Sequence, residues 1–78
     1  MNENQALEWI ANLFEVPPSS ISLETPRDDI DAWDSLGVLN LIASLDEDFE
    51  ITIEDSDLEE MKHVKDIVNI LKINGKLQ

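Results

Sequence analysis

The stretch "DAWDSLGVLNLIASLDEDF", residues 31–49, has the strongest helical pattern in the chain. Its apolar residues recur every three or four positions while its acids lie largely elsewhere, which is typical of an amphipathic helix. We predict that this helix begins at Ser35 and ends near Glu50. Its expected inward stripe consists of Leu36, Leu39, Leu41, Ile42, Leu45 and Phe49.

Three further segments complete the predicted fold. The first helix covers residues 3–15 and stops before Pro17-Pro18, because the residue before a proline is disfavoured in the helical region. A short helical turn, capped by Asp55 or Ser56, is expected to run through Glu60, and a last helix over about 64–73. The sequence therefore predicts an all-α fold: a small four-helix bundle with three longer helices and one short third helix.

The segment between the first two predicted helices, residues 16–34, shows no sustained periodicity. Prolines and charges mark it as a loop, which is long for a small domain, and such loops usually serve function or are ordered by their own side chains. Five apolar side chains are expected to pin this loop to the core: Val16, Ile21, Leu23, Ile30 and Trp33.

Length and charge limit the possible functions. The 78 residues make a single domain, residues 1–78, and the absence of cysteine excludes disulfides and thiolate metal sites. Eighteen acids face five bases, and residues 1–61 contain 17 of those acids but only one base, Arg27. Such a field repels nucleic acid and anionic membranes and attracts basic protein surfaces. No apolar run approaches a membrane span, so we expect a cytoplasmic monomer.

Motifs for catalysis or metal binding are almost absent. The only histidine is His63, and no G-x-S-x-G elbow accompanies any serine. The acidic stretch "DSDLEEMKHVKD", residues 55–66, has an EF-hand-like spacing but carries Glu60 where the calcium loop needs glycine. We therefore expect neither an enzyme nor a metal site.

Ser35 stands at the start of the central helix and has two possible roles. Asp34 or Ser35 can cap the helix by accepting hydrogen bonds from its first turn, which is worth about 1 kcal/mol. The same position favours an attached anion, because unpaired N–H groups and the positive end of the helix dipole lie there. Asp34 would repel that anion, so these arguments leave both roles open.

The stretch "DSLGVLNLIASLDEDFEITI", residues 34–53, resembles the modification segment of acyl carrier proteins and the related peptidyl carrier domains. In that family an Asp-Ser-Leu motif opens the second helix. An apolar stripe, acids, a phenylalanine and an isoleucine-rich tail follow. The order of elements, the length and the acidic charge extend the similarity to nearly the whole chain.

This resemblance implies that Ser35 carries 4′-phosphopantetheine, transferred from coenzyme A by a phosphopantetheinyl transferase. The terminal thiol of the arm then holds an acyl group as a thioester, so a chain without cysteine acquires its thiol from the cofactor. The protein itself would be a non-catalytic carrier that presents its cargo to acyl-loading, acyl-transfer or condensing enzymes with basic docking patches.

The resemblance also implies a docking surface around the arm. Asp34 and Leu36 would flank the attachment point. The other expected docking residues are Trp33, Gly37, Val38, Asp46, Glu47, Asp48, Glu54, Asp55, Asp57, Glu59 and Glu60.

The chain departs from the carriers of central fatty acid synthesis near the motif. Those carriers often have an acid directly after it, whereas this chain has Gly37 and no acid between Asp34 and Asp46. Trp33 is also bulkier than the leucine expected there. We therefore expect a carrier for a dedicated pathway, such as polyketide, nonribosomal peptide or specialised lipid assembly. The alternative from another class is an unmodified acidic helical adaptor that binds a basic partner protein.

Overall fold

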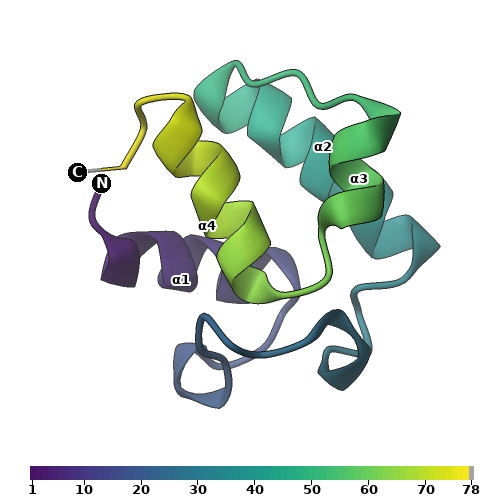
Figure 1. The fold of residues 1–78 in the computed structure, drawn as a ribbon. Coiled ribbons are helices and arrows are strands. Elements are labelled where there is room, and N and C mark those ends of the chain that lie inside the picture. Colours follow the sequence, from purple (N-terminus) through teal and green to yellow (C-terminus); the bar gives the residue numbers. More distant parts are fainter. Residues whose placement is uncertain (78) are drawn as a thin grey trace.

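The computed structural model describes residues 1–77, and within them it is helical and has no strand. Met1 and the C-terminal segment lie side by side (Figure 1), and the terminal ammonium of Met1 donates to the Lys76 carbonyl oxygen at 3.3 Å. The predicted all-α bundle with a short third helix is confirmed. The helices are α1 (Glu3–Leu13), α2 (Ser35–Phe49), α3 (Asp55–Glu60) and α4 (Val64–Ile73).

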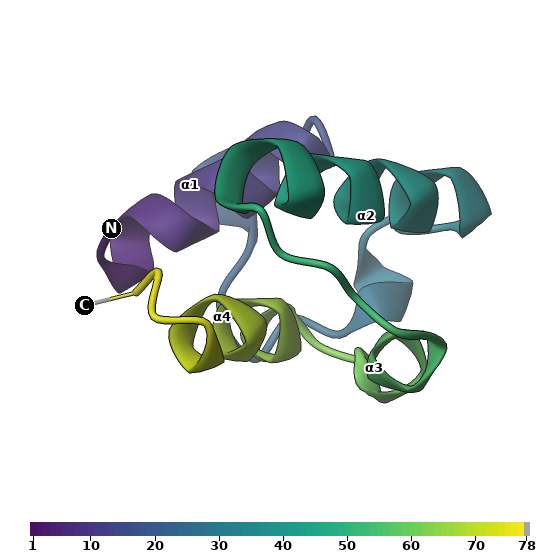
Figure 2. The same ribbon diagram turned by 90° about the horizontal axis from the view of Figure 1, so that it is seen from above.

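The helices form two layers. Figure 2 shows α1 and α2 in one layer, with α3 and α4 in the other. Helix α1 packs against both α2 and α4. The predicted long loop joins α1 to α2 and contains two short 3₁₀ turns, Pro18–Ser20 and Arg27–Asp29.

Helix α1 has a well-defined start and an earlier end than predicted. The Asn2 side chain accepts from the Gln5 amide at 2.8 Å, and the Gln5 side chain accepts from the Asn2 amide at 2.9 Å, forming a capping box. The helix ends at Leu13 rather than at residue 15, and Glu15 adopts a left-handed conformation with φ of 57°. The chain turns there because Val16 must already be extended ahead of Pro17.

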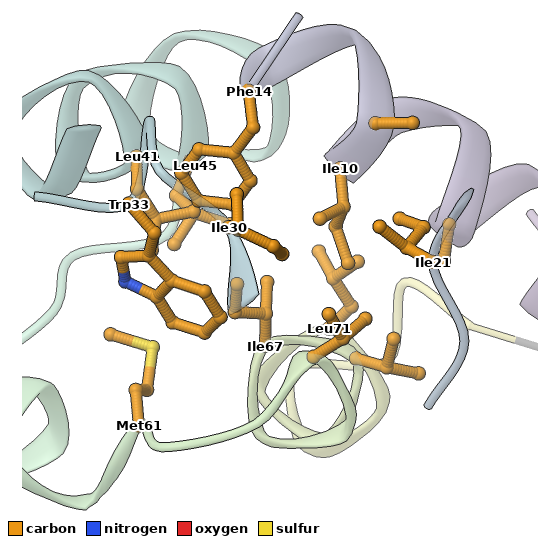
Figure 3. Packing of buried hydrophobic residues seen from close by; sticks show 14 of the residues in the cluster. Ile10, Phe14, Ile21, Ile30, Trp33, Leu41, Leu45, Met61, Ile67 and Leu71 are labelled. Carbon is orange, nitrogen blue, oxygen red and sulfur yellow. The ribbon is translucent and has the colours of Figure 1, made fainter. Parts of the chain in front are cut away.

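The core combines side chains from three helices and the loop. Figure 3 shows Ile10 of α1, and Phe14 at the C-cap of this helix, facing the side chains of α2 and α4. Fifteen apolar residues are buried within the described chain, and burial of this apolar surface is the main stabilising contribution to a fold of this size. These residues are Ala6, Ile10, Ala11, Phe14, Ile21, Ile30, Trp33, Leu41, Leu45, Ile51, Met61, Val64, Ile67, Val68 and Leu71.

The loop is held against the core by its apolar side chains, as predicted. Ile21, Ile30 and Trp33 are buried, and the other two predicted contacts are half-buried. The Trp33 ring stacks on Phe14 with centroids 5.2 Å apart and an interplanar angle of 20°. Figure 3 shows the same indole pointing toward Met61, so Trp33 joins α1 to the segment between α3 and α4.

Backbone hydrogen bonds also hold the loop, at the start of α4. The carbonyl oxygens of Thr25 and Leu23 accept from the amides of Val64 and Lys65, both at 2.9 Å. These bonds satisfy two of the first-turn N–H groups that a helix leaves without an intrahelical partner. A segment with no periodicity is therefore ordered by its pairing with a distant helix.

The predicted inward stripe of α2 is partly wrong. Leu36 and Leu39 are 69% and 62% exposed, whereas Leu41 and Leu45 are fully buried as expected. The inward face begins at Gly37 and continues with Leu41 and Leu45 at four-residue spacing. Glycine has no side chain, so its burial gives no signal in the hydrophobic pattern. The pattern therefore placed the start of the inward face at Leu36 instead of Gly37.

Gly37 is buried because the loop crosses directly against the first turn of α2. A Cβ atom at this position would collide with the carbonyl oxygen of Ala32 and would lie 3.4 Å from a ring carbon of Phe14. The obstruction is backbone, which cannot move aside like a flexible side chain. Glycine is thus required for the close approach of loop and helix.

We expect Gly37→Ala to destabilise the fold by about 1–3 kcal/mol, since the added methyl group overpacks this contact. Helix propensity alone predicts the opposite, a gain of about 1 kcal/mol. Urea unfolding measures the difference. The control is Asn40→Ala in the same helix, which is exposed and should gain a few tenths of a kcal/mol. A stabilised Gly37→Ala protein would contradict the contact.

Candidate functional site

Ser35 is the first residue of α2, but it is not the cap. The cap is Asp34, whose Oδ1 accepts from the Gly37 amide at 3.0 Å. Ser35 is exposed, and within residues 1–77 no hydrogen bond engages its hydroxyl. Of the two capping candidates, the structure therefore selects Asp34 and leaves the Ser35 hydroxyl available.

Ser35 opens onto a groove between α2 and α3. The groove has a volume of about 440 Å³ and is lined by three apolar side chains from both helices, one base, one acid and Ser35 itself. This shallow groove is open to solvent, so a flexible chain attached to the serine oxygen could lie along it. The residues lining it are Arg27, Ser35, Val38, Leu39, Leu58 and Glu59.

The exposed leucines of α2 lie beside this groove. Leu36 follows Ser35 directly, and Leu39 is itself one of the lining residues. Large apolar side chains clustered at the surface mark a contact site rather than a core. The two leucines that the hydrophobic pattern assigned to the interior thus belong to the surface around Ser35, and a role of Leu36 beside the attachment point stays a prediction.

Trp33 and Gly37, which are predicted docking residues, are both buried. Trp33 is only 3% exposed, and Gly37 is covered by Ala32 and Phe14. Their burial leaves little surface of either residue for a partner in this conformation. They act instead by placing the loop and the first turn of α2, whereas Val38 is half-buried and lines the groove.

Arg27 is a residue of the site that the sequence analysis missed. Its Nε donates to the Trp33 carbonyl oxygen at 3.1 Å, and its guanidinium carbon lies 6.0 Å from the centroid of the Trp33 ring. The sequence feature that could have identified Arg27 is its position as the only base among residues 1–61, a few residues before the Asp-Ser-Leu motif.

The predicted docking acids fall into two groups at different distances from Ser35. The first group follows on α2: Asp46 lies eleven residues beyond Ser35, about 16 Å along the axis at 1.5 Å per residue. Asp48, in this group, accepts from the Trp9 indole at 2.8 Å. The second group surrounds α3, where Glu59 borders the groove itself. The second group consists of Glu54, Asp55, Asp57, Glu59 and Glu60.

His63 has a local structural role at the start of α4. Its amide and that of Lys62 both donate to Asp66 Oδ2 at 2.9 Å, and its Nδ1 lies 3.9 Å from the same oxygen. A Ser-His-Asp triad would require a hydrogen bond between His63 and Ser35. In the part of the chain that the structure describes, these two residues make no such bond. That part of the chain also contains no group of three potential ligands that could hold a metal ion.

Comparisons with known proteins agree with this geometry. The family model described as "Phosphopantetheine attachment site" matches residues 5–71. Acyl carrier proteins of Campylobacter concisus and Bdellovibrio bacteriovorus are 35% and 36% identical over 67 residues; these alignments cover 86% of this chain and 87% and 86% of the respective relatives. That of Exiguobacterium sibiricum is 41% identical over 66 residues, covering 83% of this chain and 82% of the relative. No solved structure matches the chain.

The chain therefore belongs to the acyl carrier family with a phosphopantetheine attachment site. Its role is that of a carrier, and its cofactor is a covalently bound 4′-phosphopantetheine. The residues around Ser35 fit this group, because an exposed hydroxyl without an internal partner opens onto an apolar groove. None of the helices within residues 1–77 has the length and apolarity to cross a bilayer.

Capping and attachment can be separated by substitution. Asp34→Ala should lower the free energy of unfolding by about 1 kcal/mol, because the Gly37 amide loses its acceptor. Ser35→Ala should change it by less than about 0.5 kcal/mol, since the hydroxyl is exposed and unpaired. Urea denaturation of the unmodified protein tests both. A larger loss for Ser35→Ala than for Asp34→Ala would contradict the assignment of the cap.

Proposed function

We propose that Ser35 Oγ is the attachment point of the 4′-phosphopantetheine arm. In the loading step the serine oxygen forms a new bond to the phosphorus of coenzyme A nearest the pantetheine. The pyrophosphate bond breaks, adenosine 3′,5′-bisphosphate leaves, and the serine proton passes to a base of the transferase or to solvent. The product is a phosphodiester on the first residue of α2.

One observation carries this proposal most directly. The start of α2 is already capped by Asp34, so the adjacent serine is not needed as a helix cap. Its hydroxyl is exposed on the groove between α2 and α3. A serine kept for capping would accept from the helix amides, whereas one kept for modification needs an accessible and unpaired oxygen.

The arm supplies the chemistry that the chain lacks. The protein has no cysteine, and the thiol of the arm holds the acyl group as a thioester. Catalysis then resides in the partners: the transferase, the loading enzymes and the acyl-transfer or condensing enzymes. The alternative function, an unmodified acidic adaptor, does not account for the accessible Ser35 hydroxyl or for the groove beside it.

Electrostatic docking explains how one small carrier serves several enzymes. The net charge of −13 attracts basic surfaces at long range, and such attraction raises association rates more than it prolongs the complex. We propose that the acids around α3 provide the principal docking face, because Glu59 borders the groove that Ser35 opens onto. The acids at the far end of α2 guide the approach.

The neighbourhood of the arm supports a dedicated pathway. From Ser35 to Leu45 helix α2 has no acid, and its exposed surface beside the groove is formed by Leu36 and Leu39. Partners that recognise such a surface must present a matching apolar patch beside their basic one. We propose a pathway such as polyketide, nonribosomal peptide or specialised lipid assembly rather than general fatty acid synthesis.

Intact-protein mass spectrometry tests the attachment. Incubation with coenzyme A and a broad-specificity phosphopantetheinyl transferase should add the mass of one phosphopantetheine group. Ser35→Ala should abolish the gain, and Ser56→Ala, another exposed serine near a helix start, should retain it. A gain that persists in Ser35→Ala would disprove the proposed position.

Two charge-matched variants test the docking face. Glu59→Gln combined with Glu60→Gln should lower kcat/KM of the transferase more than Asp46→Asn combined with Glu47→Gln, although both remove two charges. The reason is the distance of each pair from Ser35, and moderate salt should reduce the difference because it screens exposed charges. Equal losses would show that overall charge, and not the face around α3, governs docking.

A further inference from the structure

Arg27 occupies an unusual position for the only base among residues 1–61. It lines the groove that contains Ser35, and it also lines an adjoining hollow together with Lys62 and His63. A cation that shares a groove with the attachment serine, in a chain dominated by acids, calls for an explanation beyond solubility.

The guanidinium group is held in place by the loop. Its Nε donates to the Trp33 carbonyl oxygen at 3.1 Å, and its Cζ lies 6.0 Å from the centroid of the Trp33 ring. The backbone amide of Arg27 donates to the Lys62 carbonyl oxygen at 2.8 Å. Since Trp33 is buried, this anchoring orients the side chain before any ligand arrives and reduces the conformational entropy lost on binding.

The remaining donors of Arg27 have no partner in the fold. The ion pairs within residues 1–77 are His63–Asp66 and Lys65–Glu24, and neither includes Arg27. Its terminal nitrogens make no hydrogen bond in the same residues, although Glu59 lines the same groove. The side chain is therefore anchored through Nε and offers its terminal N–H groups to another acceptor.

A phosphodiester on Ser35 provides such an acceptor. Its two non-bridging oxygens share one negative charge and match the fork of a guanidinium group, giving charge-assisted hydrogen bonds. The Asp34 carboxylate beside Ser35 would repel the same anion, and a nearby cation offsets that repulsion.

We propose that Arg27 binds the phosphodiester of the group attached to Ser35, directing the first part of the arm into the groove between α2 and α3. This inference rests on the proposed attachment. It gives Arg27 a positioning role in the loaded carrier that is additional to its contact with Trp33 in the unloaded one.

The test compares unloaded and loaded forms of the wild type, Arg27→Gln and Lys62→Gln. Lys62→Gln removes the same charge from the adjoining hollow, but Lys62 does not line the groove of Ser35. If Arg27 has a purely structural role, Arg27→Gln should lower the free energy of unfolding equally in the unloaded and loaded forms. The proposal adds a loss in the loaded form only, about threefold in the unfolding equilibrium constant for a partly exposed charge pair. Lys62→Gln should show no such difference.

Phosphorus and nitrogen NMR provide an independent reading. In the wild type, loading should shift the Arg27 side-chain nitrogen resonances, and Arg27→Gln should shift the ³¹P resonance of the diester while Lys62→Gln leaves it in place. The wild-type nitrogen measurement stands even if Arg27→Gln folds or loads poorly. Unchanged nitrogen resonances in a loaded wild type would overturn the inference and leave the attachment intact, whereas loss of loading itself would overturn the attachment.

Discussion

The contact between the end of the long loop and the first turn of α2 is the constraint on which the site depends. Trp33 stacks on Phe14, the C-cap residue of α1, and the Ala32 carbonyl oxygen lies against Gly37, where no larger residue fits. Because this junction is close-packed and includes backbone on both sides, it cannot slide. The first residues of α2 are therefore held at a defined place relative to α1 and the loop.

Several properties of the site follow from this junction. Burying Trp33 places its carbonyl oxygen where Arg27 donates to it, which brings a cation to the groove of Ser35. Burying Gly37 turns the neighbouring residues of α2 outward, so Ser35, Leu36 and Leu39 meet solvent. The packing of the core and the exposure of the surface around the serine thus have the same origin.

Much of the fold was predictable because helical periodicity is a local property. The predicted bounds of α4 and the predicted end of α3 agree with the structure, and α2 differs only at its C-terminal end. Helix α3 begins earlier than predicted, because Glu54 is its N-cap rather than Asp55 or Ser56. The errors on the inward face of α2 share a cause. Hydrophobicity assigned Leu36 and Leu39 to the core and left Gly37 outside it, since a residue without a side chain gives no apolar signal. Trp33 was assigned both to the core and to the docking surface, and burial supports only the first.

The sequence by itself determined the helices, the acidic charge and the Asp-Ser-Leu motif that marks the carrier family, because these depend on residue type and spacing along the chain. Only the tertiary structure decided that Asp34 rather than Ser35 caps α2, that two leucines of α2 face solvent, and that Arg27 shares a groove with Ser35. These features depend on how the loop between α1 and α2 folds back onto both helices. No periodic pattern within that loop encodes the contact, which is made by packing and by backbone hydrogen bonds to residues far along the chain.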